Sequence, residues 1–145
     1  MTLNDKQKEL LGTWKLINQE NFEEYLKAID VGIVKRKLAL SITPTLILES
    51  DGSNWKSAVI STFKSKDWNF TIGDKQRSET IDDRVYDITM TLTEDGHLIE
   101  TQEAIAGDKN SGVPSIIERY VDGNGHLVAK IEAAKVVAHR YYARV

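Results

Sequence analysis

The sequence of 145 residues contains no cysteine and only two prolines. Without cysteine there can be neither a disulfide framework nor thiol chemistry. No stretch approaches the roughly 18 apolar residues that a membrane-spanning helix needs. The first residues, 1–14, lack a basic segment followed by an apolar run, so we expect no signal peptide. These absences favour a soluble protein in the cytoplasm.

The chain also lacks an excess of positive charge and any cluster of metal-binding residue types. Its formal net charge is −3, whereas a general nucleic-acid binder needs a basic surface to displace counterions. The three histidines, His97, His126 and His139, have no metal-ligand spacing. We therefore expect no nucleic-acid partner, no metal and no cofactor.

Most of the chain has the period-two hydrophobic alternation of half-buried strands. Asp-Gly or Asn-Gly pairs separate the strand patterns and suit tight hairpin turns, so neighbouring strands should be antiparallel. Counting the runs between turns gives about ten strands, as in a sandwich or closed barrel. No linker or repeat divides residues 1–145, so we predict one all-β domain. The clearest strand patterns lie at 10–17, 54–63, 66–73 and 84–92.

Two segments near the N-terminus have helical periodicity instead. The first, 21–29, has an apolar stripe and begins with Asn21 as a possible N-cap, with Glu24 three residues later. The second, 34–42, follows Gly32 and is stopped by Pro44. Two short helices inside one hairpin connection of a barrel resemble a lid. The stripes consist of Phe22, Tyr25, Leu26 and Ile29, and of Val31, Val34, Leu38 and Ile42.

The C-terminal strand pattern places Arg140, Tyr142 and Arg144 on one face. From the pattern alone, this face either contacts water or faces an interior that must hold an anion. Arginine is almost never fully buried without a partner. We expect Arg144 to be solvated, because it lies at the end of the strand.

The sequence resembles the intracellular fatty-acid-binding protein family. The family's N-terminal signature is matched by Gly12, Trp14 and Leu16, followed by an asparagine–aromatic–acid segment and an amphipathic helix at 21–26. The resemblance continues through 61–64, 82–84, 91–98 and 139–145, and so covers essentially the whole chain. It implies an all-β, ten-stranded antiparallel up-and-down barrel. A helix–turn–helix lid would lie between the first two strands, above a water-filled cavity.

The resemblance also implies a ligand site. Family members commonly hold a fatty-acid carboxylate with two arginines and a tyrosine, which match Arg119, Arg140 and Tyr142. Arg84 matches a position near the ligand and its ordered water, and Phe63 matches a phenylalanine at the entrance.

The stripe residues Phe22 and Tyr25 are either simply core or the ligand-facing side of the lid. Gln76 stands where the family often has an aromatic residue, so that part of the wall should be more polar.

These observations predict a monomeric carrier of long-chain fatty acids, and a binding protein rather than an enzyme. A carrier of another carboxylated lipid, such as a retinoid or bile acid, is the nearest alternative. A barrel enzyme such as a lipid isomerase and a membrane-joining structural protein are less favoured. The basic run Lys35, Arg36 and Lys37 is either a solvated face or a surface for transient contact with anionic membranes.

Overall fold

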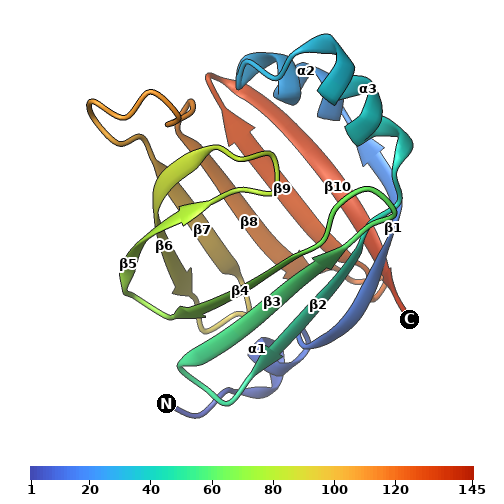
Figure 1. Cartoon of the computed structure of the whole chain (residues 1–145). Coiled ribbons are helices and arrows are strands. Elements are labelled where there is room, and N and C mark those ends of the chain that lie inside the picture. Colours follow the sequence, from blue (N-terminus) through green and yellow to red (C-terminus); the bar gives the residue numbers. More distant parts are fainter.

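Ten strands form one antiparallel sheet that curves into a nearly closed barrel (Figure 1). The structure is a computed structural model and describes all residues 1–145. This is the all-β, ten-stranded antiparallel barrel predicted from the sequence. The strands are β1 (Gly12–Glu20), β2 (Thr45–Ser50), β3 (Asn54–Ile60), β4 (Lys66–Thr71), β5 (Lys75–Glu79), β6 (Val85–Leu92), β7 (Leu98–Glu103), β8 (Ser115–Val121), β9 (Leu127–Ala133) and β10 (Val136–Arg144).

Strands that follow one another in the chain are neighbours in the sheet, except at one place. The order is β4-β3-β2-β1-β10-β9-β8-β7-β6-β5, so β1 pairs with β10 while β4 and β5 share no ladder of hydrogen bonds. We call this line the β4–β5 seam. Gln76 Nε2 lies 3.5 Å from the Asn69 carbonyl oxygen across it. The sequence analysis expected Gln76 to make the cavity wall more polar. Gln76 does not line the internal cavity; its side chain instead contacts Asn69 across the seam.

Three short helices lie at the two ends of the barrel (Figure 1). α2 (Phe22–Ala28) and α3 (Ile33–Ser41) connect β1 to β2 and cover one mouth, which we call the helix end. α1 (Asp5–Lys8), which the sequence analysis did not predict, lies at the opposite, closed end. The longest helix has nine residues, and none has the length and apolar character needed to cross a bilayer.

The lid helices differ from the sequence expectations in two details. Asn21 is not a side-chain N-cap: it has a left-handed backbone with φ of 59°, and its Nδ2 donates to the Val137 carbonyl at 2.9 Å. Val34 was expected on the inner stripe but is 78% exposed. Val31 and Ile42 of that stripe do line the cavity, and between them α3 presents Lys35 and Ala39.

A β-bulge at Ile17 changes which side chains of β1 face inwards. Leu16 pairs with Tyr142 and Asn18 pairs with Tyr141, so Ile17 is an extra residue in the ladder and is 53% exposed. A bulge shifts the period-two alternation by one residue. As a result Gln19, opposite Arg140, lies on the inner face beyond the bulge.

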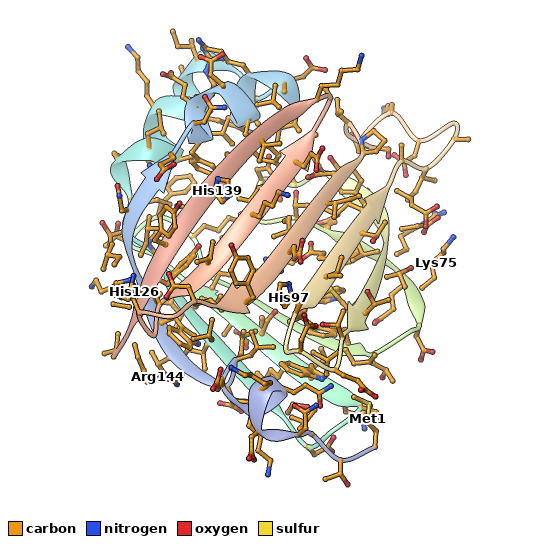
Figure 2. All side chains as sticks on the ribbon, turned by 180° about the vertical axis from the view of Figure 1, so that it is seen from behind. Met1, Lys75, His97, His126, His139 and Arg144 are labelled. Atoms are coloured by element: carbon orange, nitrogen blue, oxygen red, sulfur yellow. The ribbon has the colours of Figure 1, made fainter.

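The closed end is sealed by Trp14 and by contacts between the two ends of the chain. The Trp14 side chain is fully buried, and its Nε1 donates to the Leu10 carbonyl at 2.9 Å. The Arg144 guanidinium lies 4.1 Å from the centre of the Trp14 ring and donates to the carbonyls of Glu9 and Leu11. Arg144 is exposed, as expected, but its guanidinium is also held by these contacts, which the sequence analysis did not anticipate. Figure 2 shows Arg144 and Met1 near this end of the barrel.

Candidate ligand-binding site

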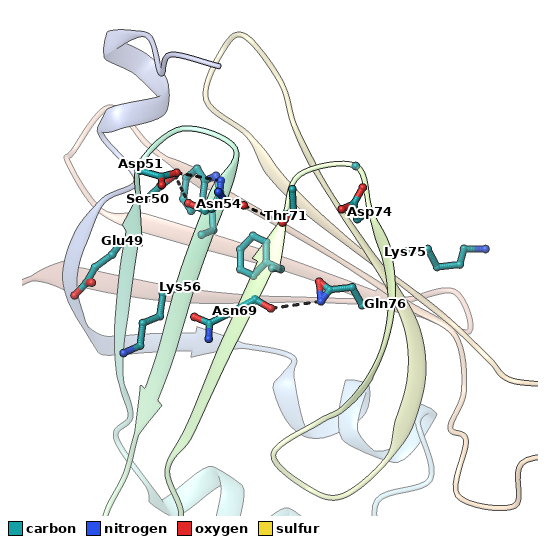
Figure 3. A pocket seen from close by; sticks show the side chains of 13 residues that line it. Glu49, Ser50, Asp51, Asn54, Lys56, Asn69, Thr71, Asp74, Lys75 and Gln76 are labelled. Carbon is teal, nitrogen blue, oxygen red and sulfur yellow. Dashed lines mark hydrogen bonds between the residues drawn. The ribbon is translucent and has the colours of Figure 1, made fainter.

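A cavity of about 320 Å³ lies inside the barrel beneath the lid. Of its 34 lining residues, 20 are hydrophobic, so it suits a ligand that is mostly apolar with a few polar groups. A larger groove of about 980 Å³ lies outside, along the β2–β3 and β4–β5 turns (Figure 3). Only two of its 13 lining residues are hydrophobic. The internal cavity is therefore the stronger candidate for a lipid site.

The structure brings together six of the seven residues that the sequence analysis singled out. The exception is Phe63, which lies in the β3–β4 turn, is 65% exposed and does not line the cavity. Its assignment to the entrance stays a prediction. The six that line the cavity are Phe22, Tyr25, Arg84, Arg119, Arg140 and Tyr142.

Arg140 has the free hydrogen-bonding capacity that an anionic head group requires. Its Nε donates to Gln19 Oε1 at 3.2 Å, and its guanidinium carbon lies 4.2 Å from the centre of the Phe22 ring. The bond to Gln19 is the only hydrogen bond of the Arg140 side chain to the protein, so its two terminal nitrogens are left without a protein partner. Tyr142 lies on the same face of β10 and is buried. Arg140 therefore presents two parallel N–H groups, the geometry that binds a carboxylate.

Arg119 faces the same interior but is already paired. Arg119 and Arg140 are both opposite Ala129 in their ladders with β9, so the two arginines flank a small side chain on one inner face. Arg119 Nη1 lies 3.0 Å from Glu100 Oε1, and Gln102 Nε2 donates to Glu100 Oε2 at 2.6 Å. This buried pair was not anticipated from the sequence.

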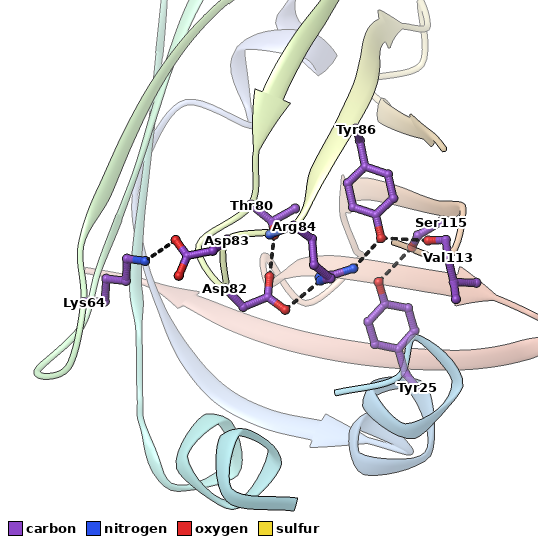
Figure 4. Close-up of polar contacts among 9 residues, drawn as sticks. All are labelled: Tyr25, Lys64, Thr80, Asp82, Asp83, Arg84, Tyr86, Val113 and Ser115. Atoms are coloured by element: carbon purple, nitrogen blue, oxygen red, sulfur yellow. Dashed lines mark hydrogen bonds and ion pairs between the residues drawn. The ribbon is translucent and has the colours of Figure 1, made fainter. Parts of the chain in front are cut away.

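Arg84 belongs to a polar network at the helix end (Figure 4). Its Nε lies 2.6 Å from Asp82 Oδ2, and its Nη1 donates to the Tyr86 hydroxyl at 2.5 Å. The Tyr86 hydroxyl in turn donates to the Val113 carbonyl at 2.8 Å. This chain of bonds joins the β5–β6 turn and β6 to the loop before β8.

The helical lid is attached to the same region. The Tyr25 hydroxyl from α2 lies 2.8 Å from Ser115 Oγ at the start of β8 (Figure 4). Burial raises the pKa of Tyr25 and the pKa of Tyr86, so both phenols stay neutral donors at physiological pH. Tyr25 therefore connects the lid to the barrel wall as well as lining the cavity.

The pKa of Asp82 reflects a balance between burial and hydrogen bonding. Burial alone would raise the pKa of Asp82, but hydrogen bonds from Arg84 and Thr80 outweigh burial and hold the pKa below its ordinary value. Asp82 is therefore a carboxylate at neutral pH. It serves as the counter-ion of Arg84 at the mouth.

The basic run on α3 does not form one continuous patch. The Arg36 side chain is only 17% exposed, and its Nη1 donates to the Val31 carbonyl at 2.8 Å. Lys35 and Lys37 are exposed. A membrane-facing surface on α3 would therefore contain two of the three predicted cations.

No part of the chain offers a metal site, because no three His, Cys, Asp or Glu side chains are grouped closely enough to hold an ion. Two carboxylates that line the cavity, the buried Glu100 and the half-buried Asp82, are each bound by an arginine. The arrangement can bind an amphipathic molecule by its polar end and enclose its apolar part.

Comparisons with known proteins agree with this geometry. Residues 11–136 match the sequence model described as the lipocalin / cytosolic fatty-acid binding protein family. The chain is 38% identical to fatty acid-binding protein homolog 6 of Caenorhabditis elegans over 136 residues, which are 94% of this chain and 97% of that protein. It is equally 38% identical to sodium/calcium exchanger regulatory protein 1 of Doryteuthis pealeii, over 94% of this chain and 97% of that protein.

Solved structures show the same fold. The apo lipid binding protein 8 of Caenorhabditis elegans superposes with a TM-score of 0.87 at 33% identity, covering 100% of both chains. A Schistosoma mansoni fatty acid binding protein in complex with arachidonic acid has a TM-score of 0.85 at 26% identity, covering 97% of this chain and 98% of that one. On its sequence, its barrel and its enclosed cavity, this chain belongs to the lipocalin / cytosolic fatty-acid binding protein family.

Proposed function

We propose that this protein binds long-chain fatty acids inside the barrel and carries them through the cytoplasm as a monomer. The observation that carries the proposal is the pair of terminal nitrogens on Arg140 that have no partner in the protein, beside Tyr142, in an otherwise mainly apolar cavity. Relatives named as fatty acid-binding proteins support the same ligand class. Sedimentation at micromolar concentration tests the monomeric state, and fractionation of cells tests the location.

In this proposal the ligand's two parts have different roles. A fatty acid is an anion at neutral pH, because carboxyl groups titrate near pH 4. Arg140 and Tyr142 fix the carboxylate and so select the head group and the orientation. The acyl chain supplies most of the affinity, since burying each CH₂ contributes about 0.8 kcal/mol.

Titration with oleate tests the proposal directly. Replacing Arg140 by leucine removes two charge-assisted hydrogen bonds, so the affinity for oleate should fall about 10- to 100-fold while the fold remains intact. Arg77→Leu is a matched control, because the Arg77 side chain is 63% exposed on the outside of β5. Unchanged affinity in Arg140→Leu would contradict the assignment. Native mass spectrometry of the purified protein would distinguish a fatty acid from a retinoid or bile acid.

We infer a carrier rather than an enzyme from the state of the cavity carboxylates. Glu100 and Asp82 are occupied as counter-ions of Arg119 and Arg84, and the third cavity-lining carboxylate, Glu79, is exposed, so no carboxylate is enclosed beside a substrate without a partner. Incubation with oleate followed by extraction should therefore return oleate unchanged. A chemically altered product would contradict this inference.

We also propose that the exposed part of the helix end contacts anionic membranes transiently during ligand transfer. Ile33, Val34 and Phe63 are 57%, 78% and 65% exposed, and Lys35 and Lys37 supply positive charge nearby. Each cation near an anionic surface contributes about 1 kcal/mol. Transfer to vesicles should therefore accelerate with anionic lipid content and slow with added salt. Rates that respond to neither would exclude this contact.

A further inference from the structure

The three arginines that line the cavity have different partners. Arg84 is paired with Asp82 at 2.6 Å, and Arg119 is paired with Glu100 at 3.0 Å. Arg140 instead contacts two neutral groups, the amide of Gln19 and the ring of Phe22. Arg140 is thus the only one of the three whose charge has no acidic partner within the protein.

Glu100 is held from both sides as a hydrogen-bond acceptor. Arg119 donates to one of its oxygens and Gln102 donates to the other, at 3.0 and 2.6 Å. The Glu100 and Arg119 side chains are only 12% and 19% exposed. Gln102 directs its amino group at Glu100 and leaves its own amide oxygen buried without a partner. Glu100 is therefore occupied on both oxygens by partners within the protein.

A ligand carboxylate bound to Arg119 would lie beside the carboxylate of Glu100. Two like charges at such short range disfavour each other strongly in a partly desolvated site. With Glu100 in place, the cluster formed by Glu100, Arg119 and Arg140 carries a net charge of one rather than two. A ligand with a neutral head group therefore loses less affinity, relative to a carboxylate ligand, than it would in a site with two unpaired arginines.

We propose that Glu100 is a specificity-determining residue that acts as a resident counter-ion on Arg119. It confines the head group to Arg140 and Tyr142, and it allows lipids with a neutral polar head, such as a hydroxyl, to bind nearly as well as free acids. This inference rests on the proposed lipid-binding function and deepens it. It concerns which head groups the site accepts.

Oleate and oleyl alcohol, which share one acyl chain, are the probes. In the wild type their dissociation constants should differ by less than about tenfold. Glu100→Gln frees Arg119 for the ligand, so oleate should bind about 10- to 100-fold more tightly while oleyl alcohol changes less than about threefold. Glu103→Gln is the matched control on the same strand, because Glu103 pairs with Lys75 on the outer face at 3.1 Å.

A second variant keeps the test valid if Glu100→Gln folds poorly. Replacing both Glu100 and Arg119 by leucine removes the pair without changing the net charge, so the affinity for oleate should stay within about threefold of the wild type. A loss of more than tenfold would show that Arg119 holds the head group and would overturn the proposal. Unchanged oleate affinity in folded Glu100→Gln would overturn it too. Failure of the wild type to bind either lipid would overturn the proposed function as well.

Discussion

The two ends of the barrel are built in opposite ways. At the closed end, Trp14 and Leu10 are completely buried, and Arg144 joins the last strand to the carbonyls of Glu9 and Leu11. At the helix end, no residue of α3 is buried, and Ile33 and Val34 project outwards. The closed end is packed throughout, whereas at the helix end only α2 buries large side chains (Phe22, Tyr25 and Leu26) and α3 buries none.

The difference indicates that the closed end mainly stabilises the fold, while the helix end can open. Burial of large side chains provides most of the stability, and here the closed end contributes much of it. At the helix end α3 has no buried residue, and beyond the packing of α2 this end is joined to the wall by single bonds such as Tyr25–Ser115 and Arg84–Tyr86, so local opening costs less here. A ligand that must enter and leave needs one end that opens while the other stays folded.

The largest expected effect is at the closed end. Trp14→Ala removes a fully buried indole, the Leu10 hydrogen bond and the Arg144 contact, and should lower the free energy of unfolding by about 3–5 kcal/mol. Urea denaturation measures this. Trp68→Ala is the control, because Trp68 is half-buried and lines the existing cavity. It should cost clearly less, and equal losses would contradict the comparison.

The next effect concerns the contact of α1 with the β6–β7 turn. Gly96 has a φ of 86°, and a Cβ added there would lie 2.7 Å from the Lys6 carbonyl oxygen. Gly73 has a similar φ of 90° but open space around it. Gly73→Ala should cost about 1–2 kcal/mol from backbone strain alone. Gly96→Ala should cost about 1–3 kcal/mol more, because α1 must also move. Similar thermal unfolding of the two variants would refute this reason.

Acidification should weaken the helix end. The folded-state pKa of Asp82 is lower than its ordinary value. The stability contributed by its bond to Arg84 is therefore complete above the ordinary carboxyl pKa of about 3.9, and it disappears as the pH falls below that value through the folded pKa. Because both side chains are partly exposed, we expect about 1 kcal/mol.

Asp82→Asn should reduce the stability at pH 7 and flatten its pH dependence in the acid range, as measured by urea denaturation between pH 2 and 7. Asp67→Asn is the control, because Asp67 is 68% exposed and lies 3.9 Å from Lys56. The same pH profile in Asp82→Asn and the wild type would show that the Arg84 bond does not stabilise this end.

The smallest effect is expected on the outer face of the lid. Val34→Ser replaces an exposed side chain and should change the free energy of unfolding by less than about 0.5 kcal/mol. Leu26→Ala, at a buried position of α2, should cost about 2–5 kcal/mol. The two variants separate the lid's outer surface from its packing. A large loss in Val34→Ser would mean that this face is covered.

The features predicted correctly from the sequence are those that repeat along the chain, such as strand alternation, or those for which several residues match the family pattern. Alternating strands and Asp-Gly turns indicate an antiparallel sandwich or barrel, and their spacing puts Arg140 and Tyr142 on one strand face. The family resemblance then chose the barrel and assigned that face to the interior. The four-residue α1 was not found, because it is too short to show a helical period.

The missed parts of the site depend on contacts between distant strands. Gln19 lies on the apparent outer face by simple alternation, and only the bulge at Ile17 turns it towards Arg140. Glu100 looks like a solvated acid on a polar strand until β8 brings Arg119 beside it. The exposure of Arg144 was expected, but its partners were missed because the carbonyls of Glu9 and Leu11 are backbone groups at the other end of the chain.

The β4–β5 seam gives the cavity a direction in which it can widen. All nine other neighbouring strand pairs are tied by backbone ladders, so stretching the wall anywhere else would break several hydrogen bonds at once. The cavity of about 320 Å³ is near the lower limit of about 300 Å³ for small-molecule pockets. If a bulkier lipid binds, the cavity can widen most easily by separation of β4 from β5. The barrel is therefore easier to deform along this seam than anywhere else around its circumference.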